Sequence, residues 1–202
     1  MSGIFKKNKQ QKREEKMDND IELSRDTYFL ENRILWLEGP INEESVSDIL
    51  KYLVYWNDNS GKRVCIFINS EGGDTTSGMA VVDAIDCLKD CGIEVWTVAC
   101  GECSSMASII LANGTEGTRF CTKNSRVMIH NSYYDDIDGH IDSIDICKKE
   151  LTVTNEAFSK ILARHSSKTA SWFTKKLEKD YYMSAEEARK VGIVDVIGFP
   201  KL

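Results

Sequence analysis

The sequence has little of what metal sites and disulfide frameworks require. Its 202 residues include only three histidines, and its seven cysteines are an odd number scattered along the chain. We therefore expect no zinc-type cluster of ligands and no metal site. Scattered, unpaired cysteines are typical of a protein in a reducing compartment, so we expect a cytoplasmic protein.

Long apolar segments are also missing. No apolar run approaches the roughly 20 residues that a membrane-spanning helix needs, and no signal peptide is recognisable, so we expect no membrane partner. The net charge is −6, and because residues 1–17 carry six Lys and Arg against two Glu, the remaining residues carry −10. This acidic body argues against nucleic acid as a partner.

The first residues lack the apolar side chains that a folded segment would bury. We therefore predict a flexible, charged tail with a basic start over residues 1–26 and a single domain over residues 27–202.

Within that domain, strands and helices are predicted to alternate, which indicates right-handed βαβ crossovers and an α/β fold. The predicted strands are 33–37, 64–68, 95–100, 126–130 and 193–197, with turns or loops at 38–40 and 69–73. The predicted helices are one that Asn42 caps, then 76–91, 106–112, 141–163, 170–177 and 185–190.

The segment 101–107, Gly-Glu-Cys-Ser-Ser-Met-Ala, leads from a predicted strand straight into an apolar helix. Ser105 is thereby placed at the helix N-terminus, where free backbone N–H groups favour developing negative charge. A serine in this position can act as a nucleophile beside an oxyanion hole. The alternative is structural, because Ser104 or Ser105 would also be an ordinary cap for a buried helix.

Gly72 and Gly73 follow another predicted strand, as in a phosphate-binding loop. The match fails because Met79 and Ala80 stand where that loop needs Lys and Ser or Thr, and we expect no cofactor. Glycine does let the backbone approach a ligand closely and point an N–H group into a cleft.

The loops after residues 68 and 100 are expected at the same edge of a parallel sheet, where sites commonly form. They can therefore share one cleft. The N–H groups of Gly73 and Met106 would then form a two-donor oxyanion hole around the hydroxyl of Ser105.

A general base is expected at the same edge. His130 closes the predicted strand 126–130, whereas His140 and His165 lie in polar surroundings and are expected at the surface. Asp180 precedes an aromatic stretch and is a candidate for a partly buried, orienting carboxylate. The alternative interpretation is that Asp180 is an ordinary exposed aspartate at the end of a helix.

Four segments in this order and spacing resemble the proteolytic subunit of the Clp protease, the ClpP family, over about residues 28–197. They are 68–73 (Ile-Asn-Ser-Glu-Gly-Gly), 104–107 (Ser-Ser-Met-Ala), 119–130 and 180–188. The resemblance implies a self-compartmentalising serine peptidase with a ClpP/crotonase-like fold, a spiral of βαβ units with a protruding helical handle. It also implies two stacked heptameric rings, polypeptide substrates and an AAA+ unfoldase as a candidate partner.

Carried over to this chain, the resemblance makes Ser105 the nucleophile, His130 the general base and Asp180 its orienting carboxylate, with Gly73 and Met106 as oxyanion donors. The order Ser–His–Asp differs from that of the α/β-hydrolases, and no GxSxG motif surrounds the serine, which excludes that fold.

The chain departs from the family pattern at three places. Glu71 stands where the family usually has proline, Asn131 and Ser132 replace Gln-Pro after the histidine, and residues 133–139 are acidic instead of glycine-rich. Two alternatives therefore stay open. One is a weakly active or inactive ClpP-like ring subunit, and the other is a crotonase-type acyl-CoA enzyme, whose fold also uses two backbone donors.

Overall fold

The computed structural model describes residues 21, 24–58, 60–133 and 141–202, with the side chains of residues 141–143 left out. The chain divides into two compact units, Met1–Ile34 and Leu35–Leu202, and each is described by itself. In the first unit, residues 24–31 are helical. All the residues assigned above to the site belong to the second unit.

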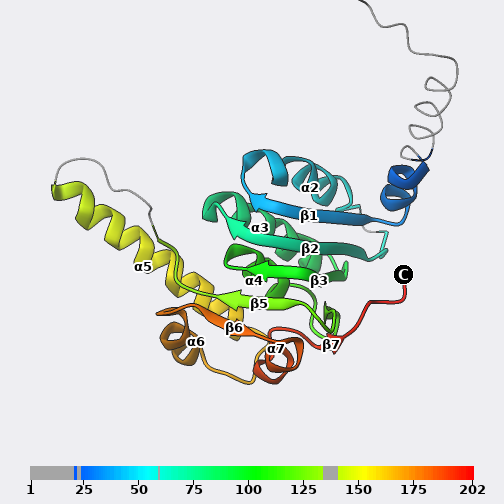
Figure 1. Cartoon of the computed structure of the whole chain (residues 1–202). Coiled ribbons are helices and arrows are strands. Elements are labelled where there is room, and N and C mark those ends of the chain that lie inside the picture. The colour runs from blue at the N-terminus through cyan, green and yellow to red at the C-terminus, as the bar shows by residue number, and fades with distance from the viewer. Residues whose placement is uncertain (1–20, 22–23, 59, 134–140) are drawn as a thin grey trace, which may run out of the picture. The chain divides into compact units, whose positions relative to one another are not determined.

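Strands and helices alternate through most of the second unit, which confirms the α/β class (Figure 1). The strands are β1 Ile34–Ile41, β2 Val64–Gly73, β3 Val95–Ser104, β4 Arg119–Cys121, β5 Arg126–Ile129, β6 Tyr181–Met183 and β7 Val196–Ile197. The helices are α2 Glu43–Tyr55, α3 Thr75–Asp90, α4 Met106–Ala112, α5 Ile141–Ala163, α6 Ala170–Leu177 and α7 Ala185–Val191.

Most predicted elements are confirmed, and α4, α5 and α6 have the predicted bounds. The cap at Asn42 is also confirmed, because its side-chain oxygen accepts a hydrogen bond from the Ser45 N–H at 2.9 Å, while the Ser45 hydroxyl accepts one from the Asn42 N–H. Strands β4 and β6 were not predicted. Each has only three residues, too few to show a hydrophobic period.

The turn expected at residues 38–40 is wrong. Strand β1 continues through Gly39 and Pro40 to Ile41. It stands first in the strand order β1-β2-β3-β4-β7, at one end of the sheet. Proline is tolerated in such a strand because one side of its backbone has no neighbour that needs an N–H donor.

Strand β3 lies in the centre of the sheet, and on one side its two halves pair with two different strands. Its first half runs parallel to β4 from Thr97 to Ala99, and its second half runs parallel to β5 from Glu102 to Ser104. Strand β2 lies along its other side, also parallel. Strand β6 is antiparallel to β5 and extends the sheet beyond it.

The loop expected at residues 69–73 is also wrong, since β2 runs on to Gly73 and β3 runs on to Ser104. The pairing continues across a register shift between Ile68 and Ser70. The Asn69 side chain bridges this shift by accepting a hydrogen bond from the Glu102 N–H at 3.0 Å. The turn between β3 and α4 therefore consists of Ser105 alone.

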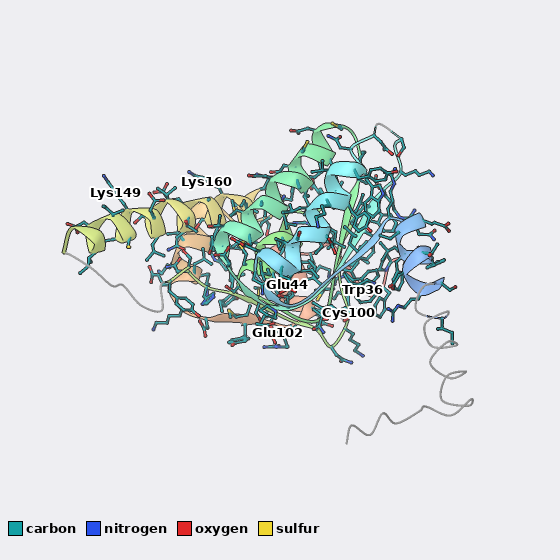
Figure 2. All side chains as sticks on the ribbon, turned by 90° about the horizontal axis from the view of Figure 1, so that it is seen from above. Trp36, Glu44, Cys100, Glu102, Lys149 and Lys160 are labelled. Atoms are coloured by element: carbon teal, nitrogen blue, oxygen red, sulfur yellow. The ribbon has the colours of Figure 1, made fainter. Side chains whose placement is uncertain are left out.

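The core lies between the sheet and the helices. Helices α2, α3 and α5 run along one side of the sheet in Figure 2. Helix α4 packs against β2 and β3, and all seven of its residues are buried. Helix α5 extends past the edge of the sheet (Figure 1), with exposed residues over its first turns, in agreement with the expected helical handle. The acidic segment 134–139 before it lies outside the described residues.

Candidate active site

Ser105 occupies a sharp turn between β3 and α4. Its backbone dihedrals are φ 54° and ψ −127°, and Arg33 is the only other described non-glycine residue with a positive φ. Such a conformation costs about 1–3 kcal/mol and persists only where the surroundings enforce it. Here the Ser105 N–H donates to the Met128 carbonyl at 2.9 Å, and its own carbonyl accepts from the Ser108 hydroxyl at 2.6 Å.

The capping alternative fails for both serines. Ser105 is the N-cap residue of α4, but its side chain makes no capping hydrogen bond. The Ser104 hydroxyl donates instead to the Glu102 carboxylate at 2.9 Å. The Ser105 hydroxyl is therefore left available for another partner.

That partner is His130. The Ser105 Oγ and His130 Nε2 atoms are 2.7 Å apart, within the range in which a serine can pass its proton to a base. The contact follows from the parallel register of β3 and β5, in which Ser104 pairs with Met128. Ser105 directly follows this pair and His130 follows it by two residues, so both emerge at the same edge of the sheet.

Asp180 lies on the other side of the imidazole, with its Oδ1 atom 3.4 Å from His130 Nδ1. Strand β6 places it there, because Ile129 pairs with Tyr181 in antiparallel register and the residues beyond this pair are His130 and Asp180. The expected partial burial is wrong, since the Asp180 side chain is 59% exposed, while that of His130 is 17% exposed. The structure thus brings all three side chains together, although the carboxylate stays in contact with water.

The chain that follows His130 is fastened by hydrogen bonds. The Asn131 N–H donates to the Leu177 carbonyl at the end of α6 at 2.7 Å. The N–H and hydroxyl of Ser132 both donate to the Asn155 side-chain oxygen on α5, at 2.8 and 2.9 Å. These bonds restrain a segment that lacks the proline expected from the family pattern.

The two glycines at the end of β2 have different surroundings. A Cβ atom on Gly72 would lie 2.7 Å from the Ser104 carbonyl oxygen and equally close to Ser105 Cβ, so only glycine fits against this turn. A Cβ on Gly73 would meet the backbone of Ile41 in β1 instead. Sequence reasoning identified the pair but missed the contact of Gly72, whose only sequence signal was the diglycine itself.

Met106 is the first residue of α4, and its side chain is buried. The first N–H groups of a helix have no partner within the helix, so this donor is available to a ligand beside Ser105. Because α4 has only seven residues, the dipole of this N–H group itself stabilises a negative charge more than the macrodipole of the helix does.

Two buried cysteines, Cys103 and Cys121, are poor nucleophiles. Burial raises the pKa of the Cys103 thiol, two residues before Ser105, well above its usual value, and that of Cys121 to about 11. Cys100 and Cys103 have a CxxC spacing, but both lie in β3. Residues three apart in an extended strand are about 10 Å apart, too far for a disulfide.

Of the two remaining histidines, the structure describes only His165. His140 lies outside the described residues. His165 was expected at the surface but is half-buried, and burial together with the nearby Arg119 lowers its pKa. It lines a cavity of about 620 Å³ with Asp86, Lys89 and Arg164 among others. None of Ser105, His130 and Asp180 lines this cavity. Among the described side chains, no group of three or more His, Cys, Asp or Glu is arranged to hold a metal ion.

Comparison with known families gives one assignment. Residues 12–201 match the sequence profile of the Clp protease family, so the chain belongs to this family. It is therefore a ClpP-type serine protease, and the mostly parallel sheet with its helices agrees with that fold. Membership implies ring assembly and protein substrates. None of the helices in the described part of the chain is long and apolar enough to span a membrane.

Proposed function

From membership of the Clp protease family and the contact between Ser105 and His130, we propose that this chain is a serine endopeptidase subunit that cleaves unfolded polypeptides or peptides. Ser105 is the nucleophile, His130 is the general base and Asp180 orients the imidazole. The observation that carries the proposal is the 2.7 Å separation of Ser105 Oγ and His130 Nε2, because a serine hydroxyl becomes nucleophilic only beside a base.

The reaction is an acyl transfer in two stages. With its Nδ1 proton facing the Asp180 carboxylate, His130 accepts the Ser105 proton at Nε2 while Oγ bonds to the peptide carbonyl carbon. The imidazolium then returns the proton to the departing amine as the C–N bond breaks, which leaves an acyl ester on Ser105. Water attacks this ester, its proton passes through His130 to Oγ, and the carboxylic acid product leaves.

The negative charge on the carbonyl oxygen needs hydrogen-bond donors during both stages. We assign this role to the backbone N–H groups of Gly73 and Met106. Gly72 is the less suitable glycine, because its N–H already donates to the Ser70 hydroxyl at 3.0 Å. The close packing of Gly72 on the turn keeps the end of β2 beside Ser105.

For assembly, we propose heptameric rings stacked in pairs, with α5 at the contact between rings. Exposed apolar side chains on α5 support this role, among them Ile146 and Val153, which lie seven residues apart and therefore on the same face of the helix. Coupling to an AAA+ unfoldase and a cytoplasmic location belong to the same proposal. Native mass spectrometry of the full chain tests the ring stoichiometry.

Labelling with a fluorophosphonate probe tests the catalytic assignment. The full chain should be labelled, peptide mapping should place the probe on Ser105, and the Ser105→Ala variant should not react. A ring subunit kept only for assembly would not be labelled. A crotonase-type enzyme would not be labelled either, and it would turn over acyl-CoA thioesters. Absence of labelling in an assembled, folded sample would overturn the proposal.

A further inference from the structure

Tyr133 contacts the proposed general base from outside the triad. Its ring centroid lies 5.5 Å from that of the His130 imidazole, and the two ring planes meet at 67°, an edge-to-face arrangement. The Tyr133 residue is nevertheless 65% exposed. A large part of the aromatic ring therefore stays open to a ligand directly beside the reacting histidine.

The backbone that carries Tyr133 is held by two helices. The bonds from Asn131 to the Leu177 carbonyl and from Ser132 to the Asn155 side chain restrain both residues between the histidine and the tyrosine. The backbone position of Tyr133 is therefore restrained by these bonds, and its ring is oriented by the edge-to-face contact with His130. Because the backbone is already ordered, a ligand that covers the ring does not have to order this segment.

We propose that Tyr133 is a specificity-determining residue that packs against the first substrate residue on the amine side of the scissile bond and favours an aromatic side chain there. This inference rests on the proposed function. The His130 Nε2 atom must hand its proton to the leaving amine, so that amine lies within hydrogen-bond distance of the imidazole. The side chain one carbon away from the amine then lies close to the Tyr133 ring.

The size of the preference follows from aromatic pairing. Two aromatic rings with centroids 4.5–7 Å apart gain a modest stabilisation beyond the burial of apolar area, which corresponds to a preference of about threefold to tenfold. An aliphatic residue of similar size buries area on the ring without this additional term. A phenylalanine at this substrate position should therefore be preferred over leucine, and leucine over alanine.

Quenched fluorescent peptides that differ only at this position, with Phe, Leu or Ala, test the inference on the full-length assembled chain. Mass spectrometry of the products confirms the cleaved bond. In the wild type, kcat/KM should be about threefold to tenfold higher for Phe than for Leu, which buries similar area but lacks the aromatic pairing. The Tyr133→Phe variant should keep this ratio, and Tyr133→Leu should bring it below about twofold.

The matched control is Tyr55→Ala, which removes an exposed tyrosine at the end of α2 and should leave the ratio unchanged. An unchanged ratio in Tyr133→Leu, or an equal loss for all three peptides, would overturn the inference, since the ring would then act on the histidine alone or not at all.

Fluorophosphonate labelling of the same samples separates the two proposals. Labelled enzyme without any preference refutes only the role of Tyr133, whereas unlabelled and inactive wild type refutes the proposed function and this inference with it.

Discussion

The proposed nucleophile, Ser105, and the proposed orienting carboxylate, Asp180, are held by two very different parts of the molecule. Ser105 lies between a ten-residue strand in the centre of the sheet and a helix whose residues are all buried. Asp180 precedes a strand of three residues, and its side chain is mostly exposed to solvent. His130 lies between these regions and contacts both.

This difference indicates how the two positions respond to change. The strained backbone of Ser105 is maintained by a close-packed core, which deforms little and in which an added methyl group is costly. The carboxylate of Asp180 is screened by water, and an exposed charge at 3.4 Å contributes less than a buried one. Substitutions on the Ser105 side should therefore have larger catalytic effects than substitutions on the Asp180 side.

The largest effect is expected for Ser105→Ala, which removes the proposed nucleophile and should lower peptide hydrolysis by several orders of magnitude. The control is Ser104→Ala, which removes only the hydrogen bond to the exposed Glu102 and should cost little. Initial rates with a quenched peptide measure both. A dead Ser104 variant beside an active Ser105 variant would show that the nucleophile is misassigned.

Gly72→Ala should come next, with a loss of activity of about a hundredfold or more, because the new methyl group must displace the Ser105 turn. The control is Gly117→Ala, at a glycine that also has a positive φ, 86° against 96°, but has open space around its Cβ position. Thermal unfolding and kcat are measured for both variants. The comparison separates the steric clash of the new methyl group with the Ser105 turn from the free-energy cost of placing alanine at a positive φ. Equal effects of the two substitutions would contradict the close contact of β2 with this turn.

For Asp180→Asn we expect a loss in kcat of about a hundredfold, smaller than the roughly 10⁴-fold typical of a buried aspartate in such a triad. The control is Glu116→Gln, which removes another exposed carboxylate 3.4 Å from a histidine, His165, at a place where no reaction is proposed. A loss as large as that of Ser105→Ala would mean that Asp180 is shielded from water when the enzyme acts.

The smallest effect on activity, with a clear effect on stability, is expected for Asp195→Asn. Asp195 pairs with Arg119, whose side chain is 1% exposed, so the variant leaves a buried cation without its partner and should lose about 3–5 kcal/mol of stability at pH 7. Burial of Asp195 raises its pKa, but the hydrogen bonds and the charge of Arg119 outweigh this and lower it overall.

A lowered folded pKa means that the stabilisation by Asp195 is complete above its ordinary pKa and disappears as the pH falls through the folded value. The difference in unfolding free energy between wild type and Asp195→Asn should therefore be largest near pH 7 and shrink in acid. Urea unfolding at neutral and acidic pH measures it. A difference that grows on acidification would contradict this sign.

Much of the scaffold could be predicted from local patterns. Apolar periodicity predicts α5 and α6 with the observed bounds, and the small-residue segment before an apolar run predicts the start of α4 at Met106. These features depend on neighbouring residues alone, since helical hydrogen bonds and caps connect residues three or four positions apart. The same segment also made Ser105 a candidate nucleophile.

The sequence by itself thus determined most of the helices and strands, the choice of Ser105 and His130 as candidates, and the family resemblance that made Asp180 the candidate carboxylate. Only the tertiary structure decided how they meet. The parallel register of β3 with β5 brings Ser105 to His130, and the antiparallel register of β5 with the short strand β6 brings in Asp180. The physical reason is that strand pairing joins residues far apart in the chain. Its register depends on packing across the whole sheet, which no local pattern of residues records.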